Sequence, residues 1–322
     1  MHKQIKEVIK ILELDLQDKV ILTEVGTGPF AYIGLIAAMA NAKKVLIWTR
    51  DSQYGSAVDN VTNIKSLISE WNADYFDANV EISIDKRPKS HIQMADIVTN
   101  SGFIRPIDAS FISEMKKNAV IAYMAEAWEF REEDVDLKAC KSYGVDIGGT
   151  WENHPSIKVF DVCGDLALKM VEDAKLTLND KSVLIISGDS FGEVILNSFS
   201  GYTSIELSAS SDLANIDPNN FDLIFIADYV SGDQIIGSNG ALKFRKDCKV
   251  AIIHLAGKVD IEFSRANNLY VFPDIEGDSY RMTRTLAYLG NDPVLKLHAA
   301  GLKVGELIHN REPNDLVQII EL

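Results

Sequence analysis

The stretch KVILTEVGTGPFAYIGLIAAM, from Lys19 to Met39, begins as an apolar run, turns at Gly26-Thr27-Gly28 and continues as an apolar run with helical spacing. Residues Gly26 to Ala31 fit the pattern G-x-G-x-x-A between a predicted strand and a predicted helix, which is where a dinucleotide-binding turn occurs. In such a turn the second glycine lets a pyrophosphate approach the backbone, and the helix N-terminus offers N–H donors. A strand-to-helix corner that binds nothing is the alternative interpretation.

The composition is that of an ordinary globular chain. Its 322 residues are 47% apolar, and this length favours two domains. No apolar run reaches the roughly 20 residues that span a bilayer, and the N-terminus is unlike a signal peptide, so we expect a cytoplasmic protein. The net charge of −15 disfavours nucleic acids and anionic membranes as partners. The three cysteines are too scattered to form a disulfide framework.

Apolar runs of strand length alternate with segments of helical period along the chain, which predicts parallel sheets built from βαβ units. The predicted strands are Val20–Thr23, Lys44–Trp48, Ala95–Thr99, Ala119–Tyr123, Val145–Gly148, Val183–Ser187, Ser204–Leu207, Leu223–Ala227, Val250–His254 and Leu269–Phe272. The predicted helices include Phe30–Met39, Asn60–Asn72, Ala109–Met115 and Phe191–Phe199.

A faint internal repeat indicates how these elements are grouped. Residues 95–126 and 221–257 share one plan, and a glycine turn precedes each. We therefore predict an α/β fold with two tandem Rossmann-like, doubly wound parallel-sheet units. The predicted parts are a dinucleotide-binding domain at 1–155, a linking helix within 156–180, a second Rossmann-like domain at 181–279, and a C-terminal helical segment at 280–322 that packs back across the first domain. In the second glycine turn, Asp189 replaces the close-approach glycine, so we expect one dinucleotide per chain.

The residues after the second predicted strand bear on the choice of cofactor. Asp51 there would hydrogen-bond a ribose 2′-OH and favour NAD, whereas Arg50 with Ser52 would hold a 2′-phosphate and favour NADP. Both cofactors remain open at this point. The predicted cofactor-binding residues are Gly26, Thr27, Gly28, Pro29, Phe30, Arg50, Asp51, Ser52, Asn100 and Ser101.

The span from Ala95 to Gly164 carries a family resemblance. Its strand Asp96–Asn100, its helix end Met115–Ala119 and its loop Gly149–Pro155 resemble the cofactor domain of the D-isomer-specific 2-hydroxyacid dehydrogenases and, more loosely, that of S-adenosylhomocysteine hydrolase. With the glycine turn, the resemblance covers about 130 residues. It implies a Rossmann fold with NAD or NADP.

The same alignment shows that the family's catalytic groups are not retained. Ala125-Glu126-Ala127 stands where the family has A-R-G, whose Arg grips the substrate carboxylate. Asp161-Val162-Cys163-Gly164 stands where the family has its general-base His in H-I-x-G. The resemblance therefore does not imply an unmodified 2-hydroxyacid reduction. A carboxylate-lined pocket would instead favour a positively charged substrate, such as an amine or an iminium.

Polar residues that follow predicted strands supply the remaining candidates, because ligands of open α/β sheets bind beyond the carboxyl ends of the strands. His254 ends a strand and is a candidate general acid or base. Arg281 is expected to share a helix face with Arg284. The candidate catalytic residues are His254, Glu126, Asp161 and His154. The candidate substrate-binding residues are Arg105, Glu152, Asn153, Asp228 and Arg281. A purely structural interpretation is also open for four of these residues, namely His254, His154, Glu126 and Arg281.

Together these patterns predict an NAD(P)-dependent oxidoreductase that acts on a small polar substrate in a cleft between the two domains. A hydrolase or lyase with tightly bound NAD, and a catalytically silent dinucleotide-binding protein, remain as alternatives. No metal is predicted, because no His, Cys, Asp or Glu cluster has ligand spacing. The expected partner is a small-molecule substrate, and a homodimer is left open.

Overall fold

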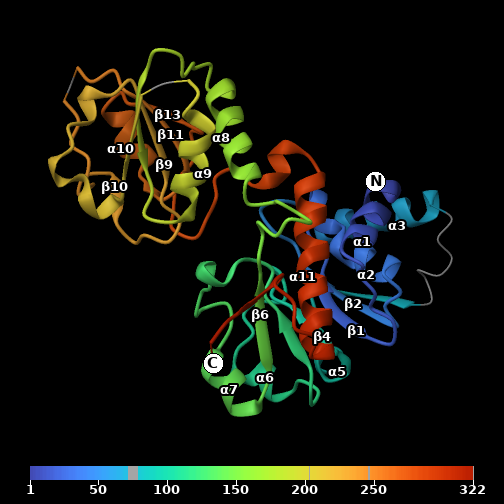
Figure 1. Ribbon diagram of the computed structural model, residues 1–322. Coiled ribbons are helices and arrows are strands. Elements are labelled where there is room, and N and C mark those ends of the chain that lie inside the picture. The colour runs from blue at the N-terminus through green and yellow to red at the C-terminus, as the bar shows by residue number, and fades with distance from the viewer. Residues whose placement is uncertain (72–78, 203, 246, 322) are drawn as a thin grey trace. The chain divides into compact units, whose positions relative to one another are not determined.

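The computed structural model describes residues 1–71, 79–202, 204–245 and 247–321 (Figure 1). The chain divides into two compact units. The first combines Met1–Val159 with Gly290–Leu322, and the second is Phe160–Leu289. Each unit contains its own mostly parallel sheet, so the predicted α/β class with two Rossmann-type units is confirmed.

The first unit is built on a seven-stranded sheet in the order β14-β6-β5-β4-β1-β2-β3. All neighbouring pairs are parallel except β14 with β6. Without β14 the strand order is 3-2-1-4-5-6, which is the order of dinucleotide-binding sheets, with the switch point between β1 and β4. The strands are β1 (Val20–Glu24), β2 (Lys44–Thr49), β3 (Val80–Ile84), β4 (Ile97–Thr99), β5 (Val120–Ala122), β6 (Asp146–Thr150) and β14 (Val317–Ile319).

Helices cover this sheet, and the long α11 (Asp292–Asn310) packs along β4, β5 and β6 (Figure 1). Glycines bring that helix close to the strands, because a Cβ on Gly305 would lie 2.5 Å from Ile97 Cγ2. Fully buried side chains such as Leu22, Val98 and Ile121 form part of the core. The other helical elements are α1 (His2–Ile11), η1 (Gly28–Ala31), α2 (Ile33–Met39), α3 (Ala57–Glu70), α5 (Lys89–Met94), α6 (Ala109–Ser113), η2 (Ala127–Glu129) and α7 (Leu137–Tyr143).

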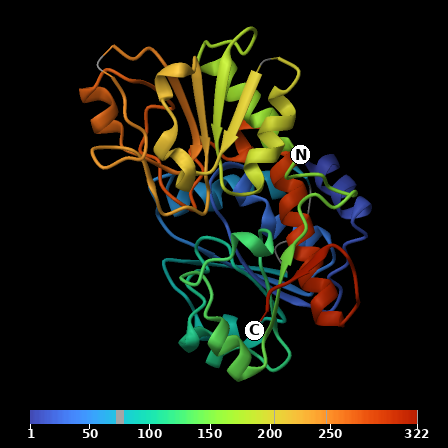
Figure 2. The ribbon, with the colours of Figure 1, turned by 60° about the vertical axis from the view of Figure 1, so that its left-hand side comes forward.

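The second unit has a five-stranded parallel sheet in the order β13-β11-β9-β7-β8, whose strands run in one direction (Figure 2). This corresponds to the order 2-1-3-4-5, with the switch point between β7 and β9. Its strands are β7 (Ser182–Ile186), β8 (Ser204–Ser208), β9 (Leu223–Ala227), β11 (Ala251–Ala256) and β13 (Tyr270–Phe272), with a separate pair β10 (Gln234–Ile236) and β12 (Lys258–Val259). Its helical elements are α8 (Val162–Asp173), α9 (Ser190–Phe199), α10 (Ile261–Ala266), η3 (Ser210–Asn215), η4 (Pro218–Asn220) and η5 (Leu286–Leu289).

Every predicted strand is present, although the bounds shift by one or two residues. The sequence analysis did not predict β3, β14 or the β10–β12 pair. It also placed Arg281 and Arg284 on a common helix face, which is wrong, because residues 280–285 form turns and the helix α11 begins only at Asp292. Among the described residues, no helix is long and apolar enough to cross a membrane.

Candidate functional site

The glycine turn follows β1 and enters η1, a single 3-10 turn that leads into α2. A Cβ on Gly26 would lie 3.1 Å from the Phe30 Cβ, so a larger residue at this position would have to push against Phe30 in η1. Gly28 has φ +60°, and a Cβ placed on it would meet no described heavy atom within 4 Å. The backbone is therefore left-handed and open on the side where a side chain would stand, which is the steric condition for a phosphate to approach.

Glu24, the last residue of β1, lies at the switch point. Its Oε2 accepts a hydrogen bond of 2.5 Å from the Phe103 backbone N–H, and a Cβ on Gly102 would lie 3.3 Å from that oxygen. Burial raises the pKa of the Glu24 carboxyl, and the nearby Arg105 and Arg50 oppose that rise. Burial thus disfavours a full negative charge beside the glycine turn.

The residues proposed to choose between NAD and NADP lie after β2. Asp51 Oδ1 accepts a 2.8 Å hydrogen bond from the Ala57 N–H at the start of α3. The guanidinium of Arg50 lies over the Phe103 ring, 5.6 Å from its centroid, and the Arg50 side chain is exposed. Ser52 pairs with Gly55 across a tight turn. Asp51 thus has a local structural role, and Arg50 is the accessible cation of this loop.

Two further predicted cofactor residues, Asn100 and Ser101, follow the end of β4. Asn100 Oδ1 accepts a 2.7 Å hydrogen bond from the Met124 N–H, which links the ends of β4 and β5. The Ser101 hydroxyl lies 2.8 Å from Thr99 Oγ1. Arg105, a predicted substrate residue, forms an ion pair of 2.7 Å with Asp134. These three residues therefore belong to the loop at the carboxyl end of β4, where the candidate site is expected.

Three buried glutamates gather after β5 and β6. Glu126 Oε1 accepts from the Glu152 N–H at 2.9 Å, and its Oε2 accepts from Trp128 Nε1 at 2.8 Å. Glu129 Oε2 accepts from the Glu126 N–H at 3.1 Å, which completes a capping box around η2. Because N–H donors occupy both of its oxygens, Glu126 acts first as a structural carboxylate. The sequence analysis had placed Glu126 among the catalytic candidates, and the structure gives it a structural role.

Glu152 differs from its two neighbours. Its side chain is 6% exposed, and burial, reinforced by the charges of Glu129 and Glu126, raises the pKa of its carboxyl well above the ordinary 4.5. Such an environment favours the protonated acid, as in enzymes that keep one carboxylic acid neutral beside ionised ones. Glu152 is therefore the residue of this cluster that is best suited to donate a proton.

His154 and Asn153 belong to the turn that follows Glu152. His154 Nε2 lies 3.2 Å from Asp315 Oδ1, and its Nδ1 accepts from the Ser156 N–H at 3.3 Å. Both ring nitrogens are thus engaged, one with Asp315 near the C-terminus and the other with Ser156 within the turn. Asp161, the other catalytic candidate from this part of the chain, directly precedes α8 in the second unit.

His254 lies inside the second unit and has no exposed surface. Its Nε2 is 2.8 Å from the Pro273 carbonyl oxygen, and burial lowers the pKa of the ring to about 4. A Cβ on Gly277 would lie 2.8 Å from its Nδ1, so this part of the chain closes over the ring. The expectation that His254 faces a cleft as a general acid or base therefore needs correction, because the ring has no exposed surface and its Nε2 lies at hydrogen-bond distance from the Pro273 carbonyl oxygen.

The switch point of the second unit holds two aspartates. Asp189 accepts hydrogen bonds from the N–H groups of Phe191, at 3.1 Å, and Tyr229, at 2.6 Å. Asp228 is 1% exposed, and its Oδ2 accepts from the Ser210 N–H at 3.1 Å. Backbone donors that could otherwise bind a phosphate are thus taken by a carboxylate of the chain. Arg281, the remaining substrate candidate, is an exposed residue of this unit.

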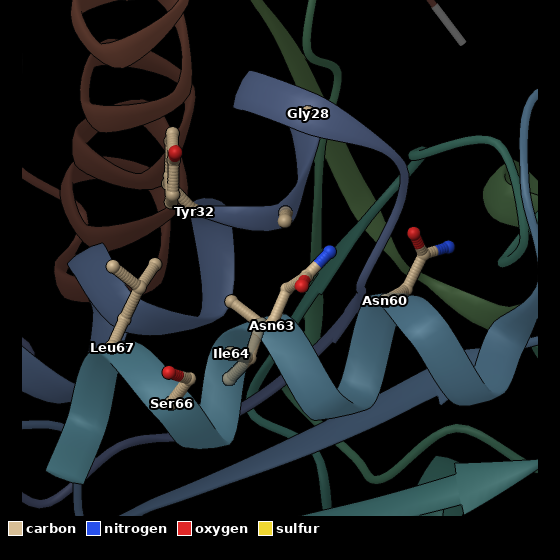
Figure 3. Close-up of a pocket in the computed structure, with 8 residues that line it drawn as sticks. Gly28, Tyr32, Asn60, Asn63, Ile64, Ser66 and Leu67 are labelled. Atoms are coloured by element: carbon tan, nitrogen blue, oxygen red, sulfur yellow. The ribbon is translucent and has the colours of Figure 1, made fainter.

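A pocket of about 300 Å³ lies beside the glycine turn in the first unit (Figure 3). Gly28 and Tyr32 line one side, and Asn60, Asn63 and other residues of α3 line the opposite side. The sequence analysis missed Asn60 and Asn63. The sequence did contain a feature that could have indicated them, since the two carboxamides are spaced i, i+3 at the start of the predicted helix Asn60–Asn72. No group of three or more metal-ligand side chains is present among the described residues.

Comparison with known proteins identifies a fold and not a family. No protein-family model and no curated protein matches the chain. Among solved structures, a dipicolinate synthase subunit from Bacillus halodurans matches with a TM-score of 0.53 at 10% identity, over 91% of this chain and 99% of that one. A putative D-3-phosphoglycerate dehydrogenase from Ralstonia solanacearum matches with a TM-score of 0.52 at 7% identity, over 93% and 96%. The chain thus has the two-domain fold of these proteins.

Proposed function

We propose that the chain is an NAD(P)-dependent oxidoreductase whose first unit binds the dinucleotide. The observation that carries this proposal is Gly28, a left-handed and sterically open glycine in a G-x-G-x-x-A turn. The turn follows the first strand of a sheet with the order 3-2-1-4-5-6, at the switch point where such sheets bind ligands. The structural likeness to a putative dehydrogenase is consistent with this proposal.

The residues of the turn fit a dinucleotide. The open face of Gly28 leaves room for phosphate oxygens, and the exposed Arg50 is a cation that directly follows β2. Pro29 removes one N–H donor from the turn, so the remaining backbone N–H groups must supply the contacts. When bound, a nicotinamide dinucleotide would supply hydride transfer to or from a substrate carbon.

The chain's own acid–base chemistry is assigned to the glutamate cluster. Glu126 and Glu129 hold the loop after β5, and their charges help to keep Glu152 protonated. In the proposed reaction Glu152 donates a proton to the substrate when the substrate is reduced. It accepts the proton back when the substrate is oxidised. The charges of Glu126 and Glu129 beside Glu152 favour a small polar substrate that carries positive charge, such as an amine or an iminium.

The test compares Gly28→Val with a matched control, Gly144→Val. Gly144 ends α7 with φ +66°, and a Cβ on it would also meet no described heavy atom within 4 Å. Both substitutions therefore introduce the same backbone strain, but only one blocks the turn. We expect Gly28→Val to abolish binding of NAD and NADP in calorimetry and Gly144→Val to retain it.

The outcomes separate the alternative functions. Exchangeable dinucleotide with a substrate-dependent change in nicotinamide absorbance supports an oxidoreductase. Dinucleotide that copurifies and does not exchange indicates a hydrolase or lyase with internal NAD, and binding without turnover indicates a silent binding protein. Equal binding by the wild type and Gly28→Val would show that the turn is only a structural corner.

A further inference from the structure

The edge strand β14 brings a side chain from the C-terminal part of the chain to the glutamate cluster. This strand ends its sheet and pairs antiparallel with β6, where Gln318 lies opposite Gly149 (Figure 1). Gln318 Oε1 accepts a 2.7 Å hydrogen bond from the Ala127 N–H, across 191 residues of sequence. Ala127 is the first residue of η2, so this bond holds the start of the turn that Glu126 and Glu129 cap.

The backbone around Ala127 is packed closely against β6. A Cβ on Gly149 would lie 2.9 Å from the Ala127 N and 3.0 Å from the Ala125 carbonyl oxygen. The Thr150 N–H donates to that carbonyl oxygen at 2.9 Å. The first N–H groups of a helical turn have no acceptor within the turn itself. Gln318 supplies the acceptor for Ala127 at the point where β6 and η2 meet.

The turn η2 also controls the surroundings of Glu152. Glu126 Oε1 accepts from the Glu152 N–H at 2.9 Å, and Glu129 Oε2 accepts from the Glu126 N–H at 3.1 Å. Burial, and after it the charges of Glu129 and Glu126, raise the pKa of the Glu152 carboxyl. A displacement of η2 would expose Glu152 and move both charges away from it, and each of these changes would favour the ionised form.

We propose that Gln318 is a positioning residue for the acid–base site, because its carboxamide holds η2, with Glu126 and Glu129, against Glu152. Gln318 acts through this turn and not on a substrate. A carboxamide suits the role, since it offers an acceptor to the Ala127 N–H without adding another charge beside three carboxyl groups. The inference rests on the proposed function, in which Glu152 is the proton donor.

Other titratable groups lie close to this site, and the experiment has to separate them from Glu152. Among the described residues, the charges that act on Glu152 are those of Glu129 and Glu126. His154, in the turn after Glu152, lies 3.2 Å from Asp315, shortly before β14. A pH-dependent signal of the whole chain would include this pair, so the measurement must report the proton of Glu152 alone.

The experiment follows the protonation of Glu152 by infrared spectroscopy as a function of pH. A protonated carboxyl and a carboxylate absorb at different frequencies, and subtracting the spectrum of the matching Glu152→Gln variant leaves the band of Glu152. Gln318→Met keeps the length of the side chain but removes the amide acceptor, and Gln318→Glu restores an oxygen acceptor. Ile319→Thr is the matched control, since Ile319 is the next residue of β14 and is 80% exposed.

We expect the titration midpoint of Glu152 to fall by about one pH unit or more in Gln318→Met. In Gln318→Glu the midpoint should stay at least as high as in the wild type, because the carboxylate accepts the same N–H and adds negative charge. In Ile319→Thr it should not change. If Gln318→Met does not fold, Gln318→Asn replaces it with the same expectation, because its side chain is one methylene too short to reach Ala127.

A loss of stability in Gln318→Met with an unchanged Glu152 midpoint would overturn the inference, because the bond would then be only structural. A wild type whose Glu152 loses its proton at the ordinary pKa of 4.5 would overturn it as well. Binding of NAD and NADP is measured separately by calorimetry. If neither binds the wild type while the midpoint still falls in Gln318→Met, the proposed function fails and the role of Gln318 stands. If a dinucleotide binds and the midpoint does not move, only the role of Gln318 fails.

Discussion

Replacing Glu152 by Gln should remove a pH-dependent component of stability from the first unit. Glutamine resembles the protonated acid in size and in hydrogen-bonding groups but cannot ionise. In the wild type, burial and the charges of Glu129 and Glu126 raise the folded-state pKa of Glu152 above the ordinary 4.5. The folded chain therefore holds this proton at pH values where the unfolded chain has lost it.

The sign and the size follow from this difference in proton binding. Relative to high pH, the contribution of Glu152 to stability is complete below its unfolded pKa of 4.5 and is lost as the pH rises through the raised folded-state pKa. Within that window the loss is about 1.4 kcal/mol for each pH unit. The difference in the free energy of unfolding, Glu152→Gln minus wild type, should therefore rise above pH 4.5. The rise should be at most about 1.4 kcal/mol for each pH unit.

Tryptophan fluorescence can follow this unit alone, because Trp48, Trp71, Trp128 and Trp151 are the only tryptophans of the chain and all belong to the first unit. Urea titrations at a series of pH values would give the free energy of unfolding of the wild type and the variant. Glu132→Gln is the matched control, since Glu132 is an exposed acid nearby. A difference between wild type and Glu152→Gln that is flat with pH would refute the assignment of Glu152 as a protonated acid.

Two further predictions concern neighbouring parts of the first unit. Arg50→Ala should weaken NADP by about 1.5–3 kcal/mol and leave NAD unchanged if the guanidinium meets a 2′-phosphate, and calorimetry with both cofactors checks this. An equal effect on both cofactors would favour NAD with Asp51. Glu126→Gln should destabilise the unit by about 1–3 kcal/mol, because the amide leaves one of the N–H groups of Glu152 and Trp128 without an acceptor. Urea unfolding followed by tryptophan fluorescence measures it, and an unchanged midpoint would show that these bonds contribute nothing.

Most of the strands that the sequence predicts lie inside the sheets, although β8 and β13, the edge strands of the second sheet, were predicted as well. Leu223–Ala227 is buried at all five positions, as expected of a central parallel strand, and it is a continuous apolar run in the sequence. The missed β3 (Val80–Ile84) is an edge strand whose residues are half-buried or exposed, and β14 (Val317–Ile319) is a three-residue edge strand. β3 does alternate apolar and polar residues, as VEISI, and the sequence analysis overlooked this period-two signal, whereas the three residues of β14 are too few to establish a period.

The candidate site also contains residues whose roles the sequence could predict and residues whose roles it could not. The roles of Gly26 and Gly28 depend on local backbone geometry, so the spacing of the turn was enough to predict them. The raised pKa of Glu152 depends on burial and on the charges of Glu129 and Glu126 in a different loop, and no local pattern contains that information. For His254 the sequence left a structural role open, and burial on all sides favours that role.

The residues at the two switch points imply different ligand preferences for the two units. At the switch point of the first unit, Gly28 leaves the backbone open and burial favours a less charged Glu24. At the switch point of the second unit, Asp189 accepts from the N–H groups of Phe191 and Tyr229, so a phosphate would have to displace a carboxylate and would meet the charge of Asp228 as well. We therefore expect anionic ligands to bind the first unit and not the second. Because the donors are already used, a ligand of the second unit would have to donate hydrogen bonds to these carboxylates rather than accept them.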